Sequence, residues 1–208
     1  MVSAASTNAA FTQTRNGVRK PQHGSREGAD TSWRSIMVDK NKTKNEVEVY
    51  QKLSIPGVPH KLLARMAGSW ETSTKSWYEP GKPPTESKGS CEQKMILAGR
   101  FLHQEFTGDM MGTVFTGIGI TGYDNFKKRY VSTWLDSMST GIFYFEGISS
   151  SDERTIAMEC RTEDPVRGRV RWRSITKIVD DNTHLFEMYI TDKSDKEQKM
   201  MEITYTRK

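Results

Sequence analysis

From Ser69 to the C-terminus, the sequence carries ten short segments with strand character and no helical period between them. We expect strands at roughly 69–78, 86–97, 100–107, 113–123, 129–136, 140–148, 154–163, 169–180, 183–191 and 197–206. Turn-forming residues separate the segments, such as Pro80 to Pro84, Asp124-Asn125 and Asp180 to Asn182. Because each segment follows the previous one after a short turn, the pattern predicts an antiparallel meander.

The meander is expected to close on itself. Side chains alternate within the segments: Val131, Thr133 and Leu135 share one face, and Ser132 and Trp134 share the other. An open sheet of ten strands leaves two exposed edges, and closing the sheet removes both. The sequence therefore predicts an all-β domain, a closed or nearly closed antiparallel β-barrel of about ten strands. Such a barrel is wide enough to hold one small ligand.

A short helix is expected just before the first strand, at residues 59–67. Pro59 suits the first helical position, Leu62 and Met66 form an apolar stripe, and Gly68 ends the helix. Residues 1–58 have few large apolar side chains and carry nine basic and five acidic residues. We interpret 1–58 as a disordered or poorly ordered basic extension and 59–208 as the barrel domain. An open alternative is that translation starts at Met37, so that residues 1–36 are not translated.

The distribution of charge bears on partners and location. The net charge is +5, but residues 59–208 hold 31 − 9 = 22 basic against 26 − 5 = 21 acidic residues. A nucleic-acid-binding protein carries its basic excess on the folded face, so no nucleic-acid partner is expected. No apolar run approaches the ~18 residues that span a bilayer, and the N-terminus lacks the apolar region of a secretory signal. We expect a cytoplasmic protein with no membrane contact, whose Cys91 and Cys160 are reduced thiols.

Gly68-Ser69-Trp70 follows the expected helix and opens the first strand. This triplet resembles the Gly-x-Trp signature of the calycins, the lipocalin-like barrels. The resemblance implies that Trp70 closes the barrel floor and that an Arg from the last strand, here Arg207, stacks over it. An Arg over an indole ring contributes about 0.5–2 kcal/mol.

A closer resemblance covers nearly all of residues 59–208. Its motifs are His60 to Leu63, Met95 to Leu102, Gly122 to Asn125, Trp134 to Met138, Phe186 to Tyr189 and Met200 to Tyr205. These motifs are similar to a bacterial family catalogued as domain of unknown function 1579, a calycin-like barrel. The resemblance implies the fold and brings no established activity with it.

Known ligands of related barrels are not implied. Fatty-acid-binding proteins use Arg-x-Tyr near the C-terminus, whereas this chain has Tyr205-Thr206-Arg207. Nitrobindin-like barrels bind haem through a His near the C-terminus, and no His follows His184 here. The sequence therefore names no cofactor.

Gly117 to Gly122 matches the dinucleotide-binding pattern Gly-x-Gly-x-x-Gly. That pattern works only where the loop opens a helix whose N-terminus holds the pyrophosphate. Here β-branched residues fill the gaps and a turn follows. We expect Gly117 and Gly119 to share one face of a strand, where small residues permit bending or close approach at a barrel corner.

Three strands carry polar residues that are candidates for a ligand site in the lumen. If their faces turn inward, the lumen holds His103, Glu105, Trp134, Asp136, Glu187 and Tyr189. Carboxylates in such a place have raised pKa values and can perform acid–base chemistry or hold a cationic ligand. The alternative is that they face solvent or pair with arginines. A register error of one residue would reverse every assignment.

Three functions remain open. The first is a small-molecule binding protein with a largely apolar ligand, to which eleven methionines and the walls offered by Trp77, Trp134 and Trp172 are suited. The second is an enzyme that uses lumen carboxylates, with catalytic residues unknown. The third is a structural or interaction protein with a packed barrel. No spacing typical of a metal site is present, and homodimerisation is compatible with a small barrel.

Overall fold

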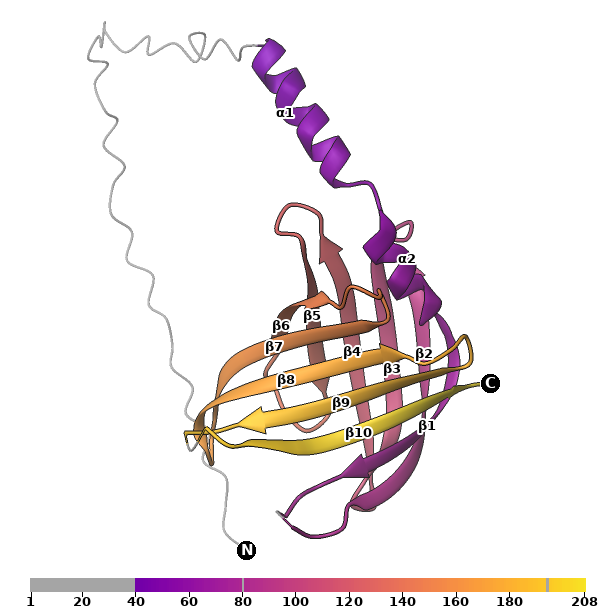
Figure 1. The fold of residues 1–208 in the computed structure, drawn as a ribbon, viewed down its shortest axis with the longest axis vertical. Coiled ribbons are helices and arrows are strands. Elements are labelled where there is room, and N and C mark those ends of the chain that lie inside the picture. The colour runs from indigo at the N-terminus through magenta and orange to yellow at the C-terminus, as the bar shows by residue number, and fades with distance from the viewer. Residues whose placement is uncertain (1–39, 80, 194) are drawn as a thin grey trace, which may run out of the picture. The chain divides into compact units, whose positions relative to one another are not determined.

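The computed structural model describes residues 40–79, 81–193 and 195–208. The predicted disorder of residues 1–39 and the alternative start at Met37 lie outside these residues. Within them, two helices precede ten strands, as Figure 1 shows. The strands are β1 (Gly68–Ser76), β2 (Thr85–Ile96), β3 (Phe101–Met110), β4 (Thr113–Asp124), β5 (Arg129–Asp136), β6 (Phe143–Ser149), β7 (Thr155–Asp164), β8 (Gly168–Ile178), β9 (Thr183–Thr191) and β10 (Glu197–Arg207).

The ten strands form one closed antiparallel barrel, which confirms the predicted fold class. Each strand pairs with its neighbours in the sequence, and β1 pairs with β10 to complete the ring. That last pairing runs from Trp70 opposite Arg207 to Ser76 opposite Met201. Closure satisfies the backbone N–H and C=O groups that an open sheet would leave at its edges.

Helix α2 (Val58–Arg65) covers one end of the barrel. It begins after Gly57, whose backbone N–H donates to His60 Nδ1 at 3.0 Å. The helix buries Leu62 and Leu63, which pack with Leu102 and Tyr130 of the barrel. Burying an aliphatic side chain of this size contributes about 1.5–3 kcal/mol. The helix predicted at 59–67 is therefore the cap of the closed end.

Helix α1 (Lys40–Leu53) is not foreseen by the sequence analysis. Its side chains from Lys44 to Lys52 are exposed, so no apolar face is buried that a periodic pattern would reveal. Its C-terminal end is held by Asn125, whose Nδ2 donates to Leu53 O at 2.8 Å and to Ile55 O at 2.9 Å.

The glycines of the Gly-x-Gly-x-x-Gly sequence lie in β4 and not at the start of a helix. A Cβ at Gly117 would lie 2.2 Å from Trp134 Cζ2, and one at Gly119 would lie 3.3 Å from Trp134 Cε3. The Trp134 ring, on the neighbouring strand β5, therefore covers both glycines. The close approach predicted for these residues is confirmed, and the packing explains them without a nucleotide.

Candidate functional site

The closed end of the barrel is sealed by Trp70 and Arg207. Arg207 Cζ lies 4.1 Å from the centroid of the Trp70 ring, the arrangement that the calycin resemblance implies. Arg207 also donates to three backbone carbonyls, those of Ala67 at 2.9 Å, Asp181 at 2.8 Å and Arg65 at 3.2 Å. Trp70 is 1 % exposed.

Aromatic rings continue the seal inward from Trp70. The His184 ring stacks on Tyr205 with centroids 4.1 Å apart and meets Trp70 edge-on at 4.4 Å. Burial, and secondarily the charge of Arg207, lower the pKa of His184 to about 4. His184 is therefore neutral at physiological pH.

A buried polar layer lies next to these rings. Gln104 Nε2 donates to the Tyr205 hydroxyl at 3.4 Å, and Gln93 Nε2 contacts Cys91 Sγ at 3.6 Å. Burial raises the pKa of Cys91 to about 12, so it holds a neutral thiol and not a nucleophilic thiolate. Three buried polar atoms of this region, Thr72 Oγ1, Gln93 Oε1 and His184 Nδ1, have no hydrogen-bond partner within the described part of the chain.

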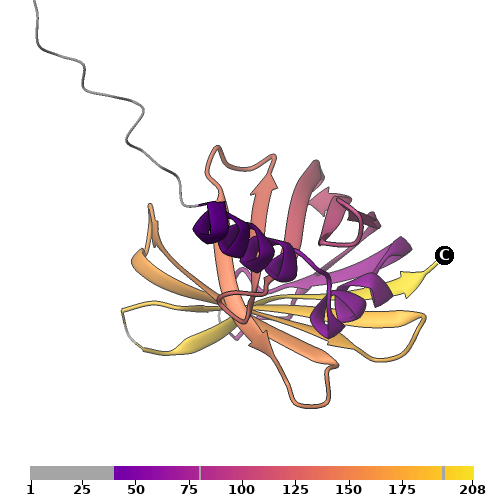
Figure 2. The ribbon, with the colours of Figure 1, turned by 90° about the horizontal axis from the view of Figure 1, so that it is seen from above.

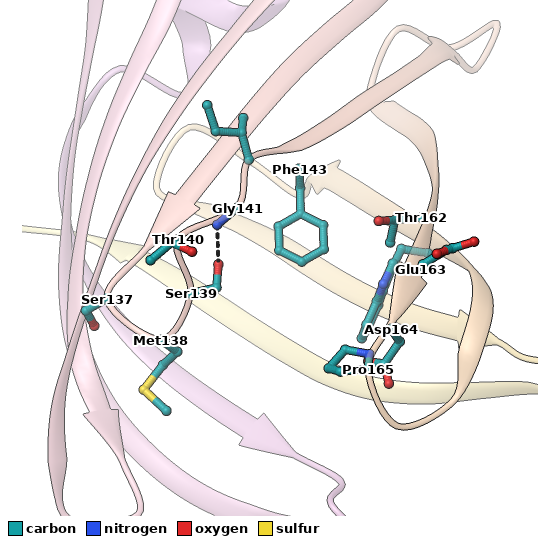
Figure 3. Close-up of a pocket in the computed structure, with 12 residues that line it drawn as sticks. Ser137, Met138, Ser139, Thr140, Gly141, Phe143, Thr162, Glu163, Asp164 and Pro165 are labelled. Atoms are coloured by element: carbon teal, nitrogen blue, oxygen red, sulfur yellow. Dashed lines mark hydrogen bonds between the residues drawn. The ribbon is translucent and has the colours of Figure 1, made fainter.

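The opposite end of the barrel contains a cup of about 610 Å³. It lies between the β5–β6 loop, residues 137–142, and the β7–β8 turn, residues 165–167. Its lining consists of residues 137–143, residues 162–165 and Trp172. In Figure 3 the Phe143 ring lies between the loop on one side and Thr162, Asp164 and Pro165 on the other.

The inner wall of the cup is aromatic. Phe143 of β6 and Trp172 of β8 meet edge-on, with ring centroids 6.4 Å apart and planes at 84°. Both side chains are half-buried, unlike the fully buried rings of Trp70 and Tyr130 at the closed end. The two rings therefore offer apolar surface to a molecule in the cup.

The polar groups at the rim are mostly hydroxyls or already occupied. Asp164 Oδ1 accepts hydrogen bonds from the backbone of Val166 and Arg167, and these bonds, with that of Arg167 the stronger, hold its pKa below the ordinary value. Asp164 therefore builds the β7–β8 turn. Ser139 Oγ accepts from Gly141 N at 3.3 Å within the β5–β6 loop. An apolar wall with a few hydroxyls at its rim is typical of small-molecule sites.

Two of the six sequence-predicted lumen residues face inward, both on β5. Trp134 packs against the buried cluster around Trp70, Phe106 and Tyr205. Asp136 accepts from Trp134 Nε1 at 2.9 Å through Oδ2 and from Met138 N at 3.0 Å through Oδ1. Asp136 thus anchors the beginning of the β5–β6 loop, and both of its oxygens already have donors.

The expected inward orientation of the other four residues does not hold. On β3, Leu102 and Phe106 are buried, so His103 and Glu105 point outward, where they form a pair 3.6 Å apart. On β9, the buried His184 and Ile190 define the inner face, which also places Glu187 and Tyr189 outside. In both strands the expected phase is wrong by one residue, and in a β-strand that exchanges the two faces.

Glu187 and Tyr189 instead belong to an outer-face network with Lys199 and Arg173. Arg173 Cζ lies 4.3 Å from the Tyr189 ring, and Lys199 is paired with both Glu187 and Glu202. Burial acts to raise the pKa of Glu187, but hydrogen bonds from Lys199 and Tyr189 outweigh it, so the pKa is lowered. This carboxylate is therefore ionised and engaged, contrary to the expectation of a raised pKa.

Among residues 40–79, 81–193 and 195–208, no three or more His, Cys, Asp or Glu side chains gather closely enough to hold a metal ion. Neither described helix has the length and apolar character needed to cross a membrane.

Comparison with known proteins places the chain in a family. A family model described as "Protein of unknown function (DUF1579)" matches residues 55–207. The chain belongs to the DUF1579 family. No curated protein sequence matches it.

Two solved structures share the barrel fold of this DUF1579 chain. Rv2717c from M. tuberculosis is 15% identical, with a TM-score of 0.54 over 74% of this chain and 99% of that one. The S-type phycobiliprotein lyase CPES from Guillardia theta is 12% identical, with a TM-score of 0.50 over 71% of this chain and 91% of that one. At these identities the likeness concerns the fold alone.

Most of the cup of this DUF1579 chain was not predicted from its sequence. Trp172 was considered as a cavity wall, but Phe143, Thr162 and the β5–β6 loop were not. The expected strand 140–148 began too early, because Gly141 and Ile142 belong to the loop and β6 begins at Phe143. The run from Ser137 to Gly141 contains small polar residues and glycine apart from Met138. It is longer than a tight turn needs and was the available signal.

Proposed function

We propose that this DUF1579 protein binds a small, largely apolar molecule in the cup at the open end of its barrel. The observation that carries the proposal is the half-buried pair of Phe143 and Trp172 at the wall of a cup of about 610 Å³. Ligand sites in proteins typically measure about 300–1,000 Å³ and are lined by aromatic and apolar groups.

The burial of aromatic side chains differs between the two ends of the barrel, and the difference favours a ligand at the open end. At the closed end, Trp70 and Tyr130 are each 1 % exposed. At the open end, the rings of Phe143 and Trp172 are only partly buried although they point into the barrel. Covering an aromatic ring with an apolar molecule is favourable by about 25 cal/mol per Å² of apolar surface removed from water.

The polar side chains at and beside the rim of the cup favour an uncharged ligand. Asp136 precedes the lining of the cup and has both oxygens occupied within the chain, and Asp164 of the lining accepts backbone hydrogen bonds within its own turn. Glu163, the other acid of the cup, is 81% exposed and lies 3.9 Å from Arg169. The polar contacts left for a ligand are the hydroxyls of Thr140 and Thr162, together with the hydroxyl proton of Ser137, whose oxygen already accepts from Thr116 N at 3.1 Å. These groups offer hydrogen bonds but little charge.

The enzyme hypothesis requires carboxylates that share the lumen, and Glu105 and Asp136 do not. Glu105 points out of the barrel and Asp136 points in, so the two lie on opposite faces of the sheet. No acid and base are therefore brought together at the cup by the residues first considered.

Binding is tested with a neutral fluorescent naphthylamine dye, titrated into the purified full-length chain. We expect saturable one-to-one binding and quenching of tryptophan fluorescence. Phe143→Ala is expected to weaken binding about tenfold, equivalent to about 1.4 kcal/mol. The matched control is Tyr144→Ala, the next residue of the same strand, which points outward and is 48% exposed.

Dye affinity that is equal in both variants would reject the cup as the site, as would a wild-type protein that shows no saturable binding. Circular dichroism of each variant establishes that the barrel is intact. Native mass spectrometry of protein purified from its own host then provides the mass of any natural occupant.

A further inference from the structure

The outer surface of β4, β5 and β6 carries an apolar patch that is unusual for the solvent side of a sheet. The outer apolar face, as we call it, consists of Ile118, Ile120, Leu135 and Tyr144, which are 46%, 38%, 38% and 48% exposed. The four are neighbours in the sheet, since Ile118 is paired with Leu135, and Thr133 lies between Ile120 and Tyr144. Contiguous apolar surface of this kind marks an interaction site.

Charged residues flank the outer apolar face in two rows. The first row crosses the strands as Glu92, Glu105, Ile118 and Leu135, and the second as Lys94, His103, Ile120, Thr133 and Tyr144. The first row therefore ends in two carboxylates, and the second ends in a lysine and a histidine whose imidazole carries a charge only when it is protonated. Strands β2, β3, β4 and β5 each contribute one residue to each row at positions i and i+2, and β6 contributes Tyr144 to the second row alone, so the rows run side by side.

The monomer leaves these charges poorly matched. Glu92 and Glu105 are direct cross-strand partners, and like charges placed opposite each other are unfavourable. Lys94 makes no ion pair within the described part of the chain, and the contact between His103 and Glu105 is long at 3.6 Å. A partner that placed basic groups over the acids and acids over the bases would relieve both.

We propose that the outer apolar face is the contact surface of a symmetric homodimer. Two copies can meet face to face about a two-fold axis that lies between the two rows and runs across the strands. The first row of each copy then faces the second row of its partner. Ile118 then lies against Ile120, Leu135 against Thr133, Glu105 against His103 and Glu92 against Lys94. The same patch serves on both copies, as a two-fold interface requires.

The interface is small and the dimer is weak. Stable complexes bury about 800 Å² on each partner with 20–30 residues, and the two rows contain fewer than that. Barrel curvature also lengthens the contacts made by the outermost strands, β2 and β6. A dissociation constant in the micromolar range follows, with an apolar centre and a charged rim.

Sedimentation velocity of the full-length chain, from low-micromolar to submillimolar concentration, tests the dimer. The wild type is expected to shift from monomer to dimer across this range. Leu135→Arg and Thr133→Arg, at the centre of the contact, should raise the dissociation constant about tenfold or more. Thr133 is a half-buried polar residue on the outer face, so its replacement leaves the core untouched. The control is Val179→Arg, 40% exposed just after β8 and distant in register from both rows.

A charge exchange tests the pairing of the rows. Glu105→Lys places a lysine against the partner's copy of the basic row and should weaken the dimer. Adding His103→Glu to that variant restores opposite charges at both places and should recover the wild-type constant. A wild type that is monomeric throughout, a central arginine without effect, or a double variant as weak as Glu105→Lys would each overturn the proposal.

This dimer is independent of the ligand cup. Tyr144→Ala is expected to weaken the dimer while preserving dye binding, and Phe143→Ala is expected to do the reverse, because adjacent residues of β6 face opposite sides of the sheet.

Discussion

Arg207 holds its guanidinium 4.1 Å above the Trp70 ring and so joins the last strand of the barrel to the first. The same side chain donates to the backbone carbonyls of Arg65, Ala67 and Asp181, which belong to the end of α2, the α2–β1 connection and the β8–β9 turn. One residue therefore ties together the helix, the barrel closure and a turn.

Removing this guanidinium is expected to be costly. Arg207→Ala loses the stacking and leaves three carbonyls without their donor, which we expect to lower the free energy of unfolding by about 2–4 kcal/mol. Arg207→Lys should recover only part of this, since an ammonium lacks the planar fork. Urea denaturation measures both variants. Arg169→Ala, whose side chain is 88% exposed, is the control and should change stability by less than about 0.5 kcal/mol. Equal stability of the Arg207 and Arg169 variants would contradict the role given to Arg207.

His184 makes the barrel sensitive to acid. Its folded-state pKa of about 4 lies below the ordinary value of 6.5, chiefly because of burial. Between these values the unfolded chain takes up a proton that the folded chain does not, so stability falls as the pH drops from about 6.5 to about 4. The loss from this residue amounts to about 3 kcal/mol by linkage.

Equilibrium unfolding of His184→Phe across the same pH range isolates this effect. Other acids and bases titrate equally in both proteins, so the difference between the two curves reports on His184. We expect the difference to change through the window from 6.5 to 4 and to be flat above it. A constant difference across the window would show that His184 does not control the acid response.

Gly117 is expected to tolerate no side chain while Trp134 covers it. A Cβ there would lie 2.2 Å from Trp134 Cζ2, so Gly117→Ala must displace the indole and strain its hydrogen bond to Asp136. We expect a loss of about 1–3 kcal/mol, typical of overpacking. Gly141→Ala is the matched control, since its Cβ would meet only Ser139 Oγ at 3.9 Å. Thermal unfolding and tryptophan fluorescence measure the outcome.

A double variant distinguishes the clash from a backbone effect. Trp134→Leu removes the ring that Gly117→Ala would strike, so the two losses should not add. Additive losses would indicate that Gly117 is needed for its own conformational freedom and not for the indole.

The strands were predictable from the sequence, whereas the faces of two of them were not. The alternation of side chains and the positions of turn residues located every strand to within a few residues, because both are local properties of the sequence. The inner face of β5 was also identified, with Trp134 and Asp136 on it. In β9, however, both faces carry apolar and aromatic residues, Phe186 and Met188 on one and Leu185 and Tyr189 on the other. The choice between them depends on which residues the neighbouring strands place opposite, and that register is a property of the closed barrel.

Contacts that form when the barrel closes also differ in whether the sequence predicts them. The contact between Trp70 and Arg207 was predicted from the resemblance to the calycins, and the pairing of β1 with β10 places the two residues opposite each other. The cup was not predicted, since it depends on where β6 starts and on how the loop that begins at Asp136 is held. Nothing in the local sequence distinguishes a loop residue such as Ile142 from a strand residue, because isoleucine is common in strands.

A variant of Asp136 tests whether the conformation of the β5–β6 loop affects ligand binding in the cup. The two oxygens of Asp136 accept from the Trp134 indole and from the backbone of Met138, so it fixes the inner side chain of β5 and the first turn of the loop together. Asp136→Asn keeps the size of the side chain but turns one acceptor into a donor, which leaves Trp134 Nε1 or Met138 N without a partner. We expect a modest loss of stability, about 1–2 kcal/mol, with a clear loss of dye affinity as the loop relaxes. Asp152→Asn is the control, because that carboxylate shapes the β6–β7 turn at the other end of the barrel. If Asp136→Asn lowers stability but leaves the affinity unchanged, the loop does not shape the binding site, and the ligand is held by Phe143 and Trp172 alone.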